Sequence, residues 1–190
     1  MLCVLRILLV GVAGLVALAA PSGVGAGAEN LPVYDDPRLV DALDLLDASS
    51  TTAHLRGVLE GNRVNIQFSP MAPGVYARYS VQRRTIEIDT RWSDAGAETL
   101  AAVIAHEATH AQDAVSGYLA TGGTSACIDS EVRAFRTSAD FWTDTFGVSG
   151  KLDVTTDLER QLNQIAQREQ MDPGSLEAVV RQTYSGQCAH

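Results

Sequence analysis

The sequence is short of cysteine, short of positive charge and short of long hydrophobic runs, and each shortage narrows the classes of protein to which it can belong. Its 190 residues contain three cysteines, with 14 Lys and Arg against 23 Asp and Glu, which gives a formal net charge of −9. A chain this acidic repels nucleic acid and anionic lipid at long range. We therefore expect no nucleic-acid partner and no electrostatic attachment to a membrane surface.

The longest apolar run, residues 7–20, is shorter than the ~20 residues that a transmembrane helix needs. It follows one positive charge, Arg6, and precedes small residues that offer cleavage sites ending at Ala19 or Ala28. We predict that residues 1–28 are a cleaved secretory signal peptide. The protein is then secreted or otherwise extracytoplasmic, without stable membrane insertion after cleavage. An uncleaved membrane anchor is the alternative.

Cleavage changes both the charge and the cysteine count of the single remaining domain, residues 29–190. The signal segment contains one charged side chain, which is positive, so its loss moves the formal charge from −9 to −10. It also removes Cys3 and leaves Cys127 and Cys188. Two cysteines in an exported protein most simply form one disulfide bond. Two free thiols, or thiolates that bind a metal, are the alternatives.

One motif has a specific chemical meaning: residues 106–110 read HEATH, which is HExxH. Residues four apart on an α-helix share a face, so His106 and His110 can offer two imidazole nitrogens to one Zn²⁺. Glu107 can then reach a water on the metal rather than the metal itself. The surrounding residues, 97–115, lack Pro and Gly and are apolar on nearly every side, which predicts a buried helix. A metal would explain polar groups in that setting, and a chance match is the alternative.

Hydrophobic periodicity predicts an α+β domain. Three β-like runs lie in the first half, and the first and last of them alternate apolar and polar residues, which indicates a small half-buried sheet that is antiparallel or mixed. We expect Ser93 or Asp94 to cap the motif helix, and Thr124 or Ser125 to cap the helix after it. The expected elements are a helix at 37–48, a segment at 52–60 that is irregular or a short helix, strands at 64–68, 75–81 and 85–89, and helices at 97–115, from 124 or 125 to 146, at 152–170 and up to Tyr184.

A catalytic zinc site usually has a third protein ligand and leaves the fourth position to water. Glu131 is the leading candidate, because it lies in the apolar stripe of its predicted helix, where a carboxylate needs a partner such as a cation. A salt bridge to a buried arginine is the alternative. Asp113, one turn from His110, is expected to accept a hydrogen bond from a histidine N–H or to be solvated. The other candidates, for which we expect no metal role, are Asp129, Asp140, His54 and His190.

HExxH followed by a glutamate on a second helix resembles the gluzincins, the thermolysin-like branch of the zinc metallopeptidases. The resemblance covers roughly residues 64–146, where strands precede the motif helix as in the active-site sheet of that family. Glu131 follows His110 by 21 positions, close to the separation in thermolysin-like members. The resemblance implies a zincin-like fold with Glu107 as general base. The implied ligands of one Zn²⁺ per chain are His106, His110 and Glu131.

The chain also departs from the patterns of known zinc peptidases. Gluzincins often have an aspartate one turn after the glutamate, where it supports a ligand histidine, and here that residue is Phe135. The longer metzincin pattern is absent, with Asp113 and Ser116 in place of its glycine and third histidine. We expect no second domain that would form the other wall of a cleft. A small single-domain form of the fold fits the length better.

The resemblance implies hydrolysis of peptide bonds in a peptide or protein substrate. Zn²⁺ would lower the pKa of its bound water toward ~7, and Glu107 would accept the proton and pass it to the leaving amine. The tetrahedral oxyanion needs a further donor, for which we expect Tyr118 first, with Tyr184 and His190 as the next candidates.

Two other functions stay open. The chain can be a catalytically silent zincin-like module that serves in binding or structure, or an exported interaction protein in which HExxH is accidental.

A bond between Cys127 and Cys188 would tie the C-terminus one helical turn from Glu131. The tail would then either limit access to the site or act only as a stabilising staple.

Overall fold

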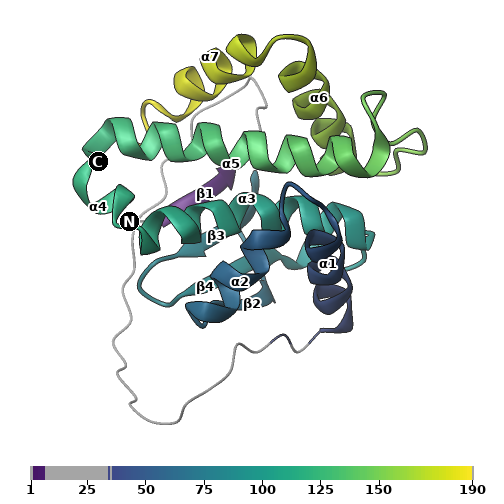
Figure 1. The fold of residues 1–190 in the computed structure, drawn as a ribbon, viewed down its shortest axis with the longest axis horizontal. Helices are drawn as coiled ribbons and strands as arrows, with labels where there is room; N and C mark the ends of the chain where they lie inside the picture. Colours follow the sequence, from purple (N-terminus) through teal and green to yellow (C-terminus); the bar gives the residue numbers. More distant parts are fainter. Residues whose placement is uncertain (1, 7–33, 35, 190) are drawn as a thin grey trace.

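Helix α3, which carries the HExxH motif, lies at the centre of the molecule (Figure 1). The computed structural model describes residues 2–6, 34 and 36–189. Within them α3 packs against α1 and α2, against α5, and against the sheet. The elements in chain order are β1 Leu2–Arg6, α1 Pro37–Ala48, α2 Ala53–Gly61, β2 Asn65–Ser69, β3 Val75–Ser80, β4 Thr85–Asp89, a 3₁₀ turn Thr90–Trp92, α3 Ala97–Val115, α4 Tyr118–Thr121, α5 Gly123–Phe146, α6 Asp157–Met171 and α7 Pro173–Tyr184.

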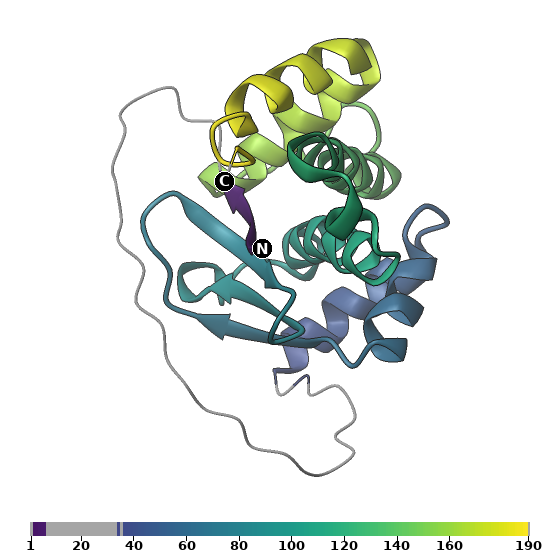
Figure 2. The same cartoon turned by 90° about the vertical axis from the view of Figure 1, so that its left-hand side faces the viewer.

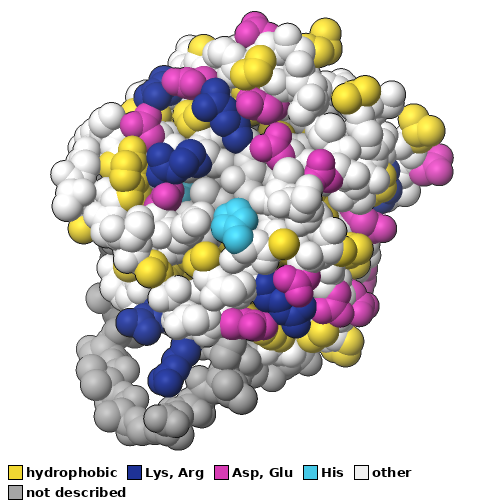
Figure 3. Space-filling view, viewed as in Figure 1, with side chains coloured by type: hydrophobic (Ala, Val, Ile, Leu, Met, Phe, Trp, Pro, Cys, Tyr) yellow, Lys and Arg dark blue, Asp and Glu magenta, His cyan; other side chains and the backbone are white. Residues whose placement is uncertain are grey.

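The predicted α+β class is confirmed, and the layers explain it. Figure 2 shows the sheet on one side of α3, with α5, α6 and α7 on the other. Fourteen of the residues of α3 are buried, as expected for a helix that is apolar on nearly every side. Acidic side chains are spread over the face in Figure 3 and intermixed with basic ones, so the negative net charge is not gathered in one patch there.

Most of the predicted signal peptide lies outside the described residues, and so do its expected cleavage sites at Ala19 and Ala28. Its residues Leu2–Arg6 are described, and they form strand β1 at one edge of the sheet. In the described part of the chain, no helix combines the length and apolarity that a membrane crossing requires.

The sheet has the order β1-β3-β4-β2, and it takes the mixed form, one of the two forms expected. β3 pairs antiparallel with β1 and with β4, but β2 pairs parallel with β4, so the sheet is mixed. The chain passes from β2 to β3 and then returns in β4 between them, which gives β2 and β4 the same direction. All five residues of β4 are buried, so its polar positions do not face water as expected.

Ion pairs explain how β4 keeps two carboxylates in the interior. Glu87 accepts from Arg78 Nε at 2.6 Å and from Arg83 Nη2 at 2.7 Å. Asp89 accepts from Arg91 in the following 3₁₀ turn. Buried carboxylates are tolerated when they are paired in this way. In β4 the alternation of polar and apolar residues therefore reflects two buried faces, not one buried and one solvent-exposed face.

The helix boundaries follow local capping, and the expected caps of two helices are wrong. Neither Ser93 nor Asp94 caps α3, which starts after Gly96 with no side-chain cap. The N-cap of α5 is Gly122, so Thr124 and Ser125 lie inside that helix. At both positions a glycine precedes the first helical residue, and a glycine has no side chain that could accept from the free amides of the first turn.

The helix predicted at 152–170 starts later, as α6, because of a capping box. The Thr156 hydroxyl accepts from the Glu159 amide, and the Glu159 carboxylate accepts from the Thr156 amide. Lys151 also pairs with the buried Glu159 carboxylate. These contacts fix the start of the helix at Asp157 and leave Leu152 outside it, 86 % exposed.

Candidate metal centre

Two helices bring three ligand-type side chains together in the interior. His106 and His110 project from α3, and Glu131 projects from the facing helix α5. The two histidine Nε2 atoms are 3.2 Å apart. Glu131 Oε2 lies 3.5 Å from His106 Nε2 and 3.6 Å from His110 Nε2. One ligand atom of each residue lies within 4.8 Å of the others, so the group can hold a single metal ion.

Burial sets the charge state of this group. His106 is fully enclosed, and loss of hydration lowers its pKa to about 4, so its ring is neutral at pH 7. Burial raises the pKa of Glu131, but the neighbouring imidazoles of His110 and His106 outweigh this and bring the pKa to about 2. Glu131 is therefore ionised. Imidazole nitrogens and one carboxylate are the donor set that a divalent cation of the zinc type prefers.

The Glu131 carboxylate gives an independent reason to expect a cation. It is 1 % exposed, and neither of its oxygens makes a hydrogen bond of normal geometry with any of the described residues. A buried carboxylate without such bonds costs several kcal/mol of folding free energy unless a charge balances it. The expected alternative, a salt bridge to a buried arginine, does not occur among the described residues, where the rings of His106 and His110 are the groups within 4 Å of the Glu131 carboxylate.

A chain of hydrogen bonds fixes the ring of His110. His110 Nδ1 lies 2.8 Å from Ser130 Oγ, and the Ser130 hydroxyl donates to Asp113 Oδ2 at 2.6 Å. Arg133 Nη2 donates to the same Asp113 oxygen at 2.8 Å. Because the single hydroxyl proton goes to Asp113, Ser130 Oγ accepts the proton of His110 Nδ1. This leaves the lone pair on His110 Nε2, where the ligand atoms converge.

Sequence reasoning placed Asp113 beside the site but missed Ser130. Asp113 does support a ligand histidine, although through the Ser130 hydroxyl rather than by the direct bond that we expected. The available signal was position. Ser130 precedes Glu131 on the same predicted helix, so it lies close to whatever Glu131 faces, here His110 and Asp113 of α3. A serine in a helix carries no chemical signature by itself, and only the packing of α5 on α3 reveals its partner.

His106 is held by packing instead. Its ring meets Phe135 edge to face at a centroid distance of 4.7 Å, and Phe135 meets Tyr184 of α7 in the same way at 5.8 Å. His106 Nδ1 has no hydrogen-bond partner among the described residues. Phe135 occupies the position at which an aspartate is common in gluzincins. An aromatic contact therefore orients the first histidine of the motif, and it links the last helix to the site.

Glu107 follows His106 on α3 and is 0 % exposed. It adjoins His106 in the chain, on a helix that is buried on nearly every side. Tyr118, the expected oxyanion donor, lies elsewhere in the described structure. Its hydroxyl donates to Asp129 at 3.3 Å, its ring packs under Arg133 at 4.2 Å, and the residue is 36 % exposed.

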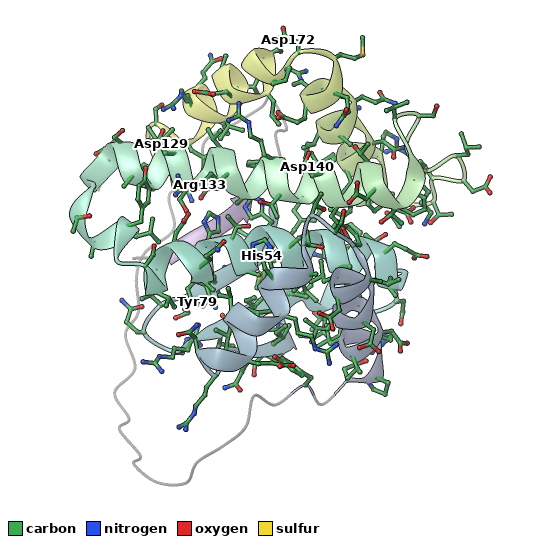
Figure 4. All side chains as sticks on the ribbon, in the orientation of Figure 1. His54, Tyr79, Asp129, Arg133, Asp140 and Asp172 are labelled. Atoms are coloured by element: carbon green, nitrogen blue, oxygen red, sulfur yellow. A yellow bond between two sulfur atoms is a disulfide. The ribbon has the colours of Figure 1, made fainter. Side chains whose placement is uncertain are left out.

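The remaining candidate ligands do not join the group. Figure 4 places Asp129 and Asp140 on α5 and His54 on α2, away from one another. Asp129 pairs with Arg181 of α7 at 2.6 Å. Burial raises the pKa of Asp140, and the charge of Asp144 adds to this shift. His190 lies outside the described residues. Across the described ranges, the group formed by the two motif histidines and Glu131 is the metal-type cluster that the side chains form.

Cys127 and Cys188 form a disulfide with a Cα–Cα distance of 5.7 Å, so neither is a thiolate ligand. The bond ties the chain that follows α7 to α5, one turn before Glu131. A disulfide is compatible with an extracellular location.

No protein-family model, no curated protein and no solved structure matches this chain. The buried group is therefore interpreted from its own geometry. That geometry defines a site on two helices, formed by His106, His110 and Glu131, that can hold a metal ion.

Proposed function

We propose that the chain is a secreted zinc metallopeptidase of the gluzincin type, small and single-domain, that hydrolyses peptide bonds. The observation that carries the proposal is the convergence of His106, His110 and Glu131 from two helices onto one point. A chance HExxH would not be expected to meet an ionised, buried carboxylate at ligand distance. The convergence therefore argues against an interaction protein with an accidental motif.

His106, His110 and Glu131 would hold one zinc ion per chain, and a catalytic zinc with three protein ligands usually takes water as the fourth. When bound, zinc supplies Lewis acidity that activates water and polarises a carbonyl group. Glu107 is the proposed general base: it accepts a proton from the attacking water and gives it to the leaving amine. Its buried setting keeps competing bulk water away from this carboxylate. Ser130 and Asp113 keep the His110 proton on Nδ1 during this exchange.

A second candidate, a catalytically silent zincin-like module, is favoured by one observation. His106, Glu107, His110 and Glu131 are each at most 1 % exposed, so a substrate carbonyl reaches them only if part of the structure moves. In this case the metal would serve as a staple between α3 and α5, and Glu107 would have no substrate. The two candidates share the metal and differ in turnover.

Metal analysis of the purified chain tests the shared step. We expect about one zinc per wild-type chain and a sharp loss of zinc in Glu131→Ala. Asp140→Ala, on the same helix but outside the group, is the matched control and should retain the metal. Full zinc in Glu131→Ala would remove that residue from the site, and no zinc in the wild type would end both candidates.

The turnover step needs a variant that keeps the metal. Glu107→Gln has nearly the same size and leaves all three ligands in place. We expect it to hold zinc at the wild-type level and to lose at least ~10³-fold in hydrolysis of a quenched fluorescent peptide library. Equal hydrolysis by Glu107→Gln and wild type would refute the mechanism. Zinc without any hydrolysis in the wild type would select the silent module.

A further inference from the structure

A pocket of about 290 Å³ lies where one end of the sheet meets the last turn of α3 and the residue that ends α2. It is lined by Asn62, Tyr79, Val81, Arg84, Ala114 and Val115, and we call it the Arg84 pocket. Figure 4 labels Tyr79 at this end of β3. Neither the motif residues 106–110 nor Glu131 lines the pocket, so it is separate from the candidate metal centre.

Two turns meet beside the Arg84 pocket, and each holds an arginine in the left-handed region of the backbone. Arg63 has a φ of 53° and Arg84 a φ of 48°. The Asn65 amide, which follows the first turn, donates to the Arg84 carbonyl at 2.9 Å and joins the two turns. Glycine or asparagine adopts this conformation with less strain than arginine does. The backbone of the turns therefore does not explain why both positions hold arginine.

The side chains of Arg63 and Arg84 form no hydrogen bond or ion pair with any residue that the structure describes. Acidic partners are plentiful, because the chain contains 23 Asp and Glu against 14 Lys and Arg. Arg83, in the same turn as Arg84, lies 2.7 Å from the Glu87 carboxylate. Two guanidinium groups without partners at one place create a local positive potential that attracts an anion.

The Arg84 pocket offers both halves of a recognition site for a small organic acid. A guanidinium is a planar fork of N–H donors that binds a carboxylate through two parallel hydrogen bonds. Apolar surface lies beside it, since Val81 lines the pocket and Val115 is 53 % exposed. A cavity of ~150 Å³ holds a benzene molecule. A volume of about 290 Å³ therefore has room for an acid of the size of benzoate or a short fatty acid.

We propose that the Arg84 pocket binds a small organic carboxylate, which places its charge on the Arg84 guanidinium and its apolar part against Val81 and Val115. Arg63 contributes a second positive charge from the adjoining turn. The proposal does not rest on the proposed peptidase function, because no metal ligand takes part. We expect a dissociation constant on the order of 1 mM for a ligand of this size.

A structural role for Arg84 is the competing explanation. Ala114 and Val115 belong to the last turn of α3, where the helix dipole places partial negative charge that a cation stabilises. The Ala114 carbonyl, however, already accepts from the Gly117 amide at 3.2 Å. The two roles predict different results when glycine, which suits the left-handed backbone, replaces Arg84.

The first test is a ¹⁹F NMR titration of the full-length chain at pH 7 with 4-(trifluoromethyl)benzoate. The neutral 4-(trifluoromethyl)benzamide is the matched ligand, and it should bind at least ~10-fold more weakly because it lacks the charge. Octanoate should displace the benzoate, whereas inorganic phosphate at the same concentration should not, because it has no apolar part. Equal binding of acid and amide, or displacement by phosphate as effective as by octanoate, would overturn the proposal.

Three variants locate the binding site. Arg84→Gln should weaken binding of the benzoate at least ~10-fold. Arg63→Gln should weaken it about two- to threefold, as expected for a charge that acts at longer range in water. Arg168→Gln removes the same charge from an exposed position on α6, and this matched control should bind like wild type. Equal binding in Arg84→Gln and Arg168→Gln would contradict the assignment.

Arg84→Gly separates binding from folding. It removes the guanidinium and relieves the strain of the turn, so it should abolish binding without lowering the thermal midpoint of unfolding. A lower midpoint with unchanged binding would give Arg84 a structural role and overturn the proposal.

Glu131→Ala separates this inference from the proposed function. Because the variant lacks a proposed metal ligand but keeps the Arg84 pocket, it should bind the benzoate like wild type. Loss of binding in Glu131→Ala but not in Arg84→Gly would place the acid on the metal and overturn the inference. Arg84→Gly should keep the zinc content and hydrolysis of the wild type, so a failure of the peptidase function would leave the binding result unchanged.

Discussion

Replacing Ser130 with alanine should weaken metal binding without removing a ligand. In the structure the Ser130 hydroxyl is the link between His110 Nδ1 and the Asp113 carboxylate, with contacts of 2.8 and 2.6 Å. Without it His110 loses the acceptor that fixes its proton on Nδ1, so the tautomer that carries a proton on Nε2 becomes accessible. That tautomer cannot bind the metal through Nε2.

The magnitude follows from what such supporting contacts contribute elsewhere. Loss of a hydrogen bond to a ligand histidine typically weakens metal affinity 10- to 100-fold, which is about 1.4 to 2.7 kcal/mol. The metal-free chain should also lose roughly 1 to 3 kcal/mol of unfolding free energy, because a buried hydrogen-bond partner is removed. Ser130→Thr keeps the hydroxyl and should recover most of the affinity.

The assay is competition for zinc against a chromophoric chelator at pH 7, with wild type, Ser130→Ala, Ser130→Thr and Ser138→Ala. Ser138 is buried on the same helix two turns further on and serves as the control for loss of a hydroxyl. Equal zinc affinity in Ser130→Ala and wild type would refute the proposed link. A similar loss in Ser138→Ala would mean that general damage to α5, rather than His110, explains the effect.

Two further predictions concern stability. The folded-state pKa values of His106 and Glu131, about 4 and about 2, lie below the values of 6.5 and 4.5 expected in the unfolded chain. Unfolding therefore takes up protons, and the unfolding free energy falls as pH drops. The His106 contribution is lost between pH 6.5 and about 4, and the Glu131 contribution between pH 4.5 and about 2. Urea unfolding of the metal-free chain should show a loss on the order of 3 kcal/mol between pH 7 and 4 that His106→Gln lacks, and equal pH slopes would contradict it. Breaking the Cys127–Cys188 bond, which spans 61 positions, with a double serine variant should cost about 4 kcal/mol in the same assay, whereas a reductant should not further destabilise that variant.

The metal group shows what sequence periodicity can predict. Glu131 was identified because a carboxylate in an apolar stripe needs a partner, and the structure places that carboxylate against the two histidines. Helical spacing fixes which residues share a face, so both the motif and the third candidate follow from position alone. The Ser130 link does not, because it depends on how α5 is rotated against α3.

The sheet has features that sequence periodicity does not predict. Alternation located the strands β2, β3 and β4 to within a residue or two, but it carries no information on strand order. The polar residues of β4 indicated a wet face, and their burial became clear only with the arginines that pair with Glu87 and Asp89. These partners come from three different segments, and their meeting is a property of the tertiary fold.

The enclosure of the ligands also determines how quickly an ion can enter or leave. His106, His110 and Glu131 lie between two packed helices, so a cation reaches them only during a local separation of α3 and α5. Such openings have a rate of their own. Uptake by the folded chain should therefore level off as the ion concentration rises, and release should proceed at a rate independent of chelator concentration. Under these kinetics, a chain that is still folding acquires its ion faster than a chain that has finished.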